Sequence, residues 1–135
     1  DFYSVAQHEL GHMLGIGTSS RWFNQISGGA FHGASAKSLY GGPVPVQSSG
    51  AHWADGVKGF GCFCPSCTGA AAAATAQASL DPTLPYGQRV GFSELDFAAL
   101  RDIGWSVTAP NTATSPSAPA PTTRAVSPPP PPGPA

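Results

Sequence analysis

The chain has 135 residues, a formal net charge of -1 and only 10% charged side chains, well below the ~25% typical of soluble domains. This charge-poor, glycine-rich composition fits an exported protein better than a cytosolic helical enzyme. The sequence contains no basic cluster that would indicate nucleic acid or an anionic membrane as a partner, and no run of 18 apolar residues that would span a membrane.

Composition divides the chain into two regions. From Ala109 onward the sequence is almost entirely Ala, Pro, Ser and Thr, and this stretch holds ten of the 15 prolines. Such a segment cannot bury enough apolar surface to offset the entropy of ordering it. We therefore predict one folded domain over residues 1–108 and a disordered Pro-rich spacer over residues 109–135.

The first predicted element is a helix from Phe2 to Leu14. Asp1 can cap its N-terminus, and Gly15 and Gly17 can end it. Several apolar residues recur at helical spacing, and we expect them to contact the core. They are Phe2, Val5, Ala6, Leu10, Met13 and Leu14.

The following segments predict short elements between loops. Residues 18–33 read as a Gly/Ser-rich loop, Ala34 to Tyr40 as a short helix, and Val44 to Val46 as an edge strand, where proline is tolerated. We expect four large side chains to anchor the loop. They are Trp22, Phe23, Ile26 and Phe31.

Residues 56–79 read as an insertion with a cysteine cluster and an alanine run at 70–74. The cluster consists of Cys62, Cys64 and Cys67, an odd number that leaves at least one thiol unpaired within the chain. A Cys64–Cys67 disulfide, a soft-metal site and inert thiols are all open interpretations.

The last predicted helix begins at Ser93, which forms a capping-box pattern with Asp96. Gly104 ends this helix, and Trp105 and Val107 are expected to dock the end of the domain. Four residues form the predicted buried stripe of the helix. They are Leu95, Ala99, Leu100 and Ile103.

The first helix carries the sequence His8-Glu9-Leu10-Gly11-His12. Histidines four residues apart project from one helix face about one turn apart, where both imidazoles can bind one zinc ion. Zinc lowers the pKa of bound water to about 7, and Glu9 can accept the proton and pass it to a leaving amine. The motif predicts a zinc hydrolase; two surface histidines beside a surface glutamate are the alternative.

A catalytic zinc site usually takes three protein ligands, so one more must come from elsewhere in the chain. Thr18 is a poor ligand because its hydroxyl is neutral. Glu94 offers a carboxylate, although a first-turn glutamate is also favoured by the helix dipole. His32 and His52 are loop histidines that residue chemistry alone does not separate.

The stretch from His8 to Gly17 resembles the active-site helix and glycine turn of metzincin zinc peptidases. The later segments are similar to leishmanolysin-type enzymes of a bacterial exported group, in which a tryptophan follows the third zinc histidine. His52-Trp53 matches that pattern, and the segments 80–82 and 95–105 also resemble the end of this group's catalytic domain. The similarity covers residues 1 to about 107.

The resemblance implies an α+β zincin-like fold, of which this chain is expected to hold the C-terminal part without the N-terminal sheet. It implies His8, His12 and His52 as zinc ligands and Glu9 as general base. Leu80 takes the position of the methionine that lies under the zinc in metzincins, and leucine offers a similar apolar volume.

We therefore expect an extracellular or cell-surface zinc metalloendopeptidase, with zinc as cofactor and proteins or peptides as substrates. Two alternatives stay open. One is a non-catalytic, zinc-stabilised surface or adhesion module that has kept the motif, and the other is a zinc amidase acting on a non-peptide amide.

Overall fold

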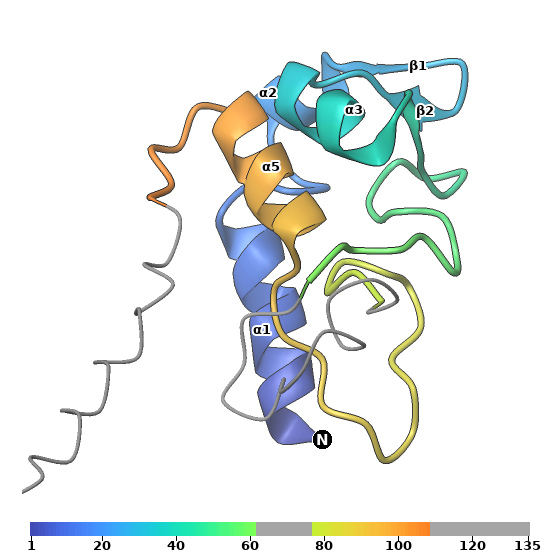
Figure 1. Ribbon diagram of the computed structural model, residues 1–135, viewed down its shortest axis with the longest axis vertical. Helices are drawn as coiled ribbons and strands as arrows, with labels where there is room; N and C mark the ends of the chain where they lie inside the picture. Colours follow the sequence, from blue (N-terminus) through green and yellow to red (C-terminus); the bar gives the residue numbers. More distant parts are fainter. Residues whose placement is uncertain (62–76, 109–135) are drawn as a thin grey trace, which may run out of the picture.

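A computed structural model describes residues 1–61 and 77–108, so the three cysteines, the alanine run and the predicted tail lie outside the described residues. The described part is a small α+β fold with four helices and a three-stranded antiparallel sheet in the order β1-β2-β3 (Figure 1). The elements are α1 (Phe2–Met13), α2 (Ser20–Phe23), β1 (Ile26–Ser27), β2 (Ala30–Phe31), α3 (Ala34–Tyr40), β3 (Val44–Pro45) and α5 (Glu94–Asp102). No helix in these two ranges is long and apolar enough to cross a membrane.

Helix α1 begins where predicted and ends one residue earlier, at Met13, but it buries a different face. Its buried residues are Ser4, His8 and Gly11, because the segment after residue 77 packs on the polar side of the helix. Phe2 is 86% exposed and Met13 83% exposed. The prediction that these apolar residues contact the core is therefore wrong, except at Leu14, which follows the helix and packs against the core. The exposed apolar residues of α1 are Phe2, Val5, Ala6, Leu10 and Met13.

The segment predicted as a loop over residues 18–33 contains α2 and a β-hairpin, so that prediction is wrong in part. Gly28 and Gly29 join β1 to β2 with φ angles of 57° and 76°, as a two-residue hairpin turn with two positive φ angles requires. Strands of two residues carry no alternation that could be recognised in the sequence. Of the four predicted anchors, Trp22 and Phe31 are fully buried, Ile26 is partly buried and Phe23 is exposed.

Helix α3 and the edge strand β3 lie where the sequence predicted them. The N-terminus of α3 is capped from α5, because the Asp102 carboxylate accepts hydrogen bonds from the backbone N of Ser35 at 2.8 Å and of Ala36 at 2.9 Å. A Cβ at Gly33 would overlap that carboxylate, so only glycine permits the close approach of the two helices. In Figure 1, α5 accordingly lies between α1 and α3.

Helix α5 confirms the predicted capping box of Ser93 and Asp96. The four residues of its predicted stripe are all buried. Beyond the helix, the indole Nε1 of Trp105 donates to the carbonyl O of Leu14 at 2.8 Å. This bond joins the end of α5 to the end of α1, although the Trp105 side chain is half exposed.

Three aromatic side chains form the centre of the core. The rings of Trp22 and Phe31 stack with centroids 4.3 Å apart, and Trp53 meets Trp22 edge-on at 4.9 Å. Trp22 and Trp53 are fully buried, and Trp22 Nε1 donates to the carbonyl O of Gly50 at 2.7 Å. The core therefore fixes the residue that directly follows His52.

Candidate metal centre

His8, His12 and His52 converge on one point. Their Nε2 atoms form a triangle with sides of 3.2 Å (His8–His12), 3.1 Å (His8–His52) and 3.1 Å (His12–His52). Two nitrogens bound tetrahedrally to one zinc at about 2.0–2.1 Å lie about 3.3–3.4 Å apart, close to these values. The three side chains can therefore hold one metal ion.

The opposite ring nitrogen of each histidine faces an oxygen acceptor. Nδ1 of His8 donates to the carbonyl O of Ser79 at 2.7 Å, and Nδ1 of His12 to the carbonyl O of Ile16 at 2.9 Å. Nδ1 of His52 donates to the side-chain Oε1 of Gln47 at 3.2 Å.

These contacts determine where the protons lie. A carbonyl oxygen only accepts hydrogen bonds, so each Nδ1 carries a proton, and in the neutral form of the ring Nε2 then has a lone pair. The three lone pairs then face one another, an arrangement that a shared cation stabilises. Metal-binding histidines characteristically donate their other ring N–H to such acceptors. The donor set of this cluster therefore fits a metal ion.

Helix α1 and the segment around Leu80 together place the first two histidines. Gly11 lies on the helix turn between His8 and His12, and a Cβ there would lie 2.5 Å from Cδ2 of Leu80. Leu80 is fully buried against this glycine, while the preceding Ser79 supplies the acceptor for His8. The leucine therefore packs directly on the helix turn that presents both ligands.

The loop after β3 places His52 through a close backbone approach. Gly17 has a φ of 72°, and a Cβ on it would overlap the backbone carbonyl of Ala51. On the other side of His52, the backbone N of Trp53 donates to the carbonyl O of Leu80 at 3.1 Å. The loop is thereby held between the turn that follows α1 and the segment that packs on α1.

One buried carboxylate connects several of these supports. Asp96 is fully buried and accepts hydrogen bonds from Nε1 of Trp53 at 2.9 Å, from the backbone N of Ser79 at 2.8 Å and from the backbone N of Leu80 at 3.4 Å. It also accepts bonds from the backbone N and the hydroxyl of Ser93. Sequence reasoning found only the capping role, because no local pattern links position 96 to positions 53 and 79.

The electrostatic environment favours the neutral form of His52. Burial lowers the pKa of His52 below its ordinary value, and the neighbouring His12 and His8 lower it further, whereas the negative charges of Glu9 and Asp81 raise this pKa. A neutral imidazole is the form that binds a metal ion. Glu9 follows His8 on α1 and is exposed, and its negative charge acts on His52.

The other residues considered from the sequence as third ligands lie outside the cluster. His32 is exposed directly after β2, where its Nε2 donates to the carbonyl O of Ser27 at 3.2 Å. Glu94 is the first residue of α5, and its backbone N donates to Phe60. The Thr18 hydroxyl donates to the carbonyl O of His12 at 2.6 Å and so provides a donor for a carbonyl group in the last turn of α1.

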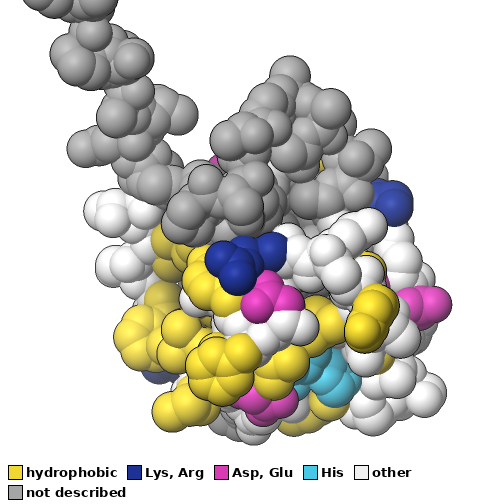
Figure 2. Space-filling model, turned by 90° about the horizontal axis from the view of Figure 1, so that it is seen from below, with side chains coloured by type: hydrophobic (Ala, Val, Ile, Leu, Met, Phe, Trp, Pro, Cys, Tyr) yellow, Lys and Arg dark blue, Asp and Glu magenta, His cyan; other side chains and the backbone are white. Residues whose placement is uncertain are grey.

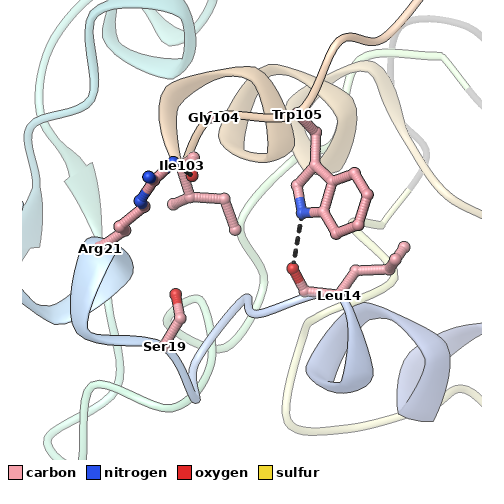
Figure 3. Close-up of a pocket in the computed structure, with 6 residues that line it drawn as sticks. All are labelled: Leu14, Ser19, Arg21, Ile103, Gly104 and Trp105. Atoms are coloured by element: carbon pink, nitrogen blue, oxygen red, sulfur yellow. Dashed lines mark hydrogen bonds between the residues drawn. The ribbon is translucent and has the colours of Figure 1, made fainter.

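A pocket between the ends of α1 and α5 contains none of the predicted site residues (Figure 3). Its polar groups make structural hydrogen bonds, since Nη1 of Arg21 donates to the carbonyl O of Ile103 at 3.2 Å and the Ser19 hydroxyl donates to Gly15. Its lining consists of Leu14, Ser19, Arg21, Ile103, Gly104 and Trp105. The pocket belongs to the junction of the two helices.

Comparisons with protein-family models, with curated proteins and with solved structures found no match for this chain. The histidine cluster is therefore the feature of this chain from which a function can be inferred.

Proposed function

We propose that this chain forms the metal centre of a zinc-dependent endopeptidase. His8, His12 and His52 are the ligands in this proposal, and Glu9 is the general base. The observation that carries it is the convergence of three Nε2 lone pairs, each fixed by an Nδ1–H that donates to an oxygen. Imidazole ligands suit zinc. Three protein ligands are the number used in catalytic zinc sites, whereas structural sites generally use four.

The chemistry follows from the neighbours of the cluster. A zinc ion in such a site acts as a Lewis acid that lowers the pKa of bound water to about 7 and polarises a substrate carbonyl. Glu9 accepts a proton from the attacking water and returns it to the amine that leaves when the peptide bond breaks. The three neutral histidines hold their Nδ1 protons throughout, so Glu9 alone carries the transferred proton.

The surroundings of the cluster support a metzincin-like, zincin-type fold of the leishmanolysin kind. Gly15 and Gly17 turn the chain after α1 with φ angles of 107° and 72°, and Leu80 packs against Gly11. His52 is followed by a buried tryptophan. We assign the enzyme to the extracellular space or cell surface on the basis of its composition, and we assign proteins or peptides as its substrates.

Figure 2 supports a role for the surface beside the histidines. Hydrophobic side chains gather on the face where histidine side chains are visible, and the exposed apolar residues of α1 flank Glu9 in the sequence. An apolar surface beside the ligands suits the side chains of an extended peptide.

The test is the zinc content of the purified protein with its cysteines blocked, for the wild type and for His52→Ala and His32→Ala. We expect one zinc per chain in the wild type and in the His32 variant, and a large loss in the His52 variant. A peptide-cleavage assay then separates the candidate functions. Zinc binding without any cleavage, at equal levels in wild type and Glu9→Gln, would favour the non-catalytic module, and absence of zinc would refute the metal centre.

A further inference from the structure

The three histidines differ in what holds their Nδ1 atoms. The acceptors for His8 and His12 are backbone carbonyls, of Ser79 and Ile16, which no side-chain substitution removes. The acceptor for His52 is the side-chain Oε1 of Gln47. Of the three Nδ1 acceptors, only that of His52 belongs to a side chain. A substitution at position 47 can therefore remove or change this acceptor.

The backbone brings these two residues together. The residues flanking them, Val46 and Trp53, form an antiparallel bridge. Within the bridge, the backbone N of Gln47 donates to the carbonyl O of His52 at 3.0 Å, and the backbone N of Gly50 donates to the carbonyl O of Gln47 at 2.7 Å. The backbone pairing across this short loop thus places the side chain at position 47 beside the imidazole at position 52.

A second donor orients the Gln47 amide. The Ser49 hydroxyl also donates to Oε1, at 3.3 Å, and Ser49 Oγ itself accepts from the backbone N of Ala51 at 3.2 Å. Both contacts reach the same oxygen, so the structure places the carbonyl end of the amide toward His52. An acceptor in that position holds the proton of His52 on Nδ1, and this keeps the Nε2 lone pair directed at the cluster.

From this arrangement we propose that Gln47 is a positioning residue that sets the tautomer and orientation of His52 and thereby the affinity of the centre for its metal ion. The inference rests on the proposed metal centre. A neutral amide is a weaker acceptor than a carboxylate, so glutamine leaves the affinity at an intermediate level. A carboxylate at position 47 strengthens the bond to Nδ1 and makes Nε2 the better donor, whereas a methyl group at position 47 leaves His52 free to rotate and to change tautomer.

The test uses two substitutions with opposite expected effects. In competition with a chromophoric chelator at pH 7.5, with the cysteines blocked, Gln47→Glu is expected to lower the Kd for zinc about 3- to 10-fold. Gln47→Ala is expected to raise the Kd about 10-fold, the lower end of the range for outer-shell partners. Gln88→Glu places the same charge at another exposed glutamine and is expected to leave the Kd unchanged. Because Gln47 is exposed, both variants should retain the fold.

A second measurement does not depend on zinc. The ¹⁵N chemical shifts of the His52 ring in the metal-free protein distinguish an Nδ1–H from an Nε2–H tautomer. We expect the Nδ1–H form in wild type and Gln47→Glu, and a mixture of tautomers in Gln47→Ala.

The outcomes separate the two proposals. Normal zinc binding by wild type, with unchanged Kd and tautomer in both Gln47 variants, would overturn the role of Gln47 and leave the metal centre standing. An equal weakening by alanine and glutamate would show that glutamine acts only through the shape of the loop, and would also overturn it. Failure of the wild type to bind zinc would overturn both proposals.

Discussion

The indole Nε1 of Trp53 donates a hydrogen bond to Oδ1 of Asp96 at 2.9 Å, and both side chains are fully buried. Trp53 directly follows one histidine of the cluster. The other oxygen of the same carboxylate accepts from the backbone N of Ser79, whose carbonyl holds His8. The buried Asp96 carboxylate on α5 thus binds the neighbour of His52 and the residue that holds His8. These two histidines are 44 positions apart in the chain.

Asp96→Asn tests this connection. An amide has a single acceptor oxygen and brings an NH₂ group against existing donors, and hydrogen bonds to a buried charge contribute about 1.5–3 kcal/mol each. We expect unfolding in urea to require about 2–4 kcal/mol less free energy, and zinc affinity to fall as well. Ser93→Ala removes the helix cap, at about 0.5–2 kcal/mol, while leaving the bonds to Trp53 and Ser79. Equal losses of zinc affinity in the two variants would contradict a role of the bonds from Asp96 to Trp53 and Ser79 in placing the histidines.

Glu9→Gln tests the proposed chemistry. The amide has the size of the carboxylate but accepts no proton, and general base catalysis typically contributes about 10²- to 10⁴-fold. We expect zinc content to stay at one per chain and the rate of peptide cleavage to drop by at least that factor. Glu94→Gln, the same change at the other glutamate of the chain, should keep the rate. Turnover by the Glu9 variant at the wild-type rate would remove Glu9 from the mechanism.

Gly17→Ala tests how the loop of His52 is placed. The new Cβ would overlap the carbonyl of Ala51, and the φ of 72° adds backbone strain. We expect a loss of about 2–5 kcal/mol in unfolding free energy, from strain and overlap together, and weaker zinc binding, because the neighbouring histidine must move. Gly28→Ala is the matched control, since its φ is 57° and no atom lies within 4 Å of the new methyl group. That control should lose about 1–2 kcal/mol from strain alone and keep its zinc affinity.

The lowered pKa of His52 predicts how the metal-free protein responds to pH. Since its pKa in the folded state lies below the ordinary value of 6.5, the unfolded chain binds the proton more tightly than the folded one. Stability is therefore unaffected above about pH 7 and falls as the pH drops below about 6.5. Urea titrations at pH 7.5, 6.5 and 5.5 should show this fall reduced in His52→Gln. An identical pH dependence in both proteins would contradict the prediction.

Elements with strong local signals could be predicted from the sequence. The capping aspartate and the terminal glycines bounded α1, Gly41 ended α3, and the pairing of Ser93 with Asp96 marked the start of α5. The proximity of His8 and His12 follows from helix geometry alone.

What the sequence left open depends on distant contacts. Residue chemistry left His32 and His52 equal, and the structure brings His52 to the cluster. The periodicity of α1 identified an apolar stripe but not which side of the helix the chain covers, so Phe2 and Met13 were wrongly expected in the core. The role that we propose for Gln47 has no sequence signature, because only the folded loop brings this glutamine beside the histidine five residues later.

His12 and His52 lie 40 positions apart, and a metal ion bound to both closes a ring of that length. In this respect the ion acts like a disulfide, for which the chain-entropy estimate at about 40 residues is roughly 4 kcal/mol. The chain segment between these two ligands contains α2, the sheet and α3, whereas α5 follows it in the sequence. Removing the ion with a chelator should therefore loosen the segment between the two ligands, and limited proteolysis of the chelated protein should show new cleavage sites between residues 18 and 51 that the metal-bound protein lacks.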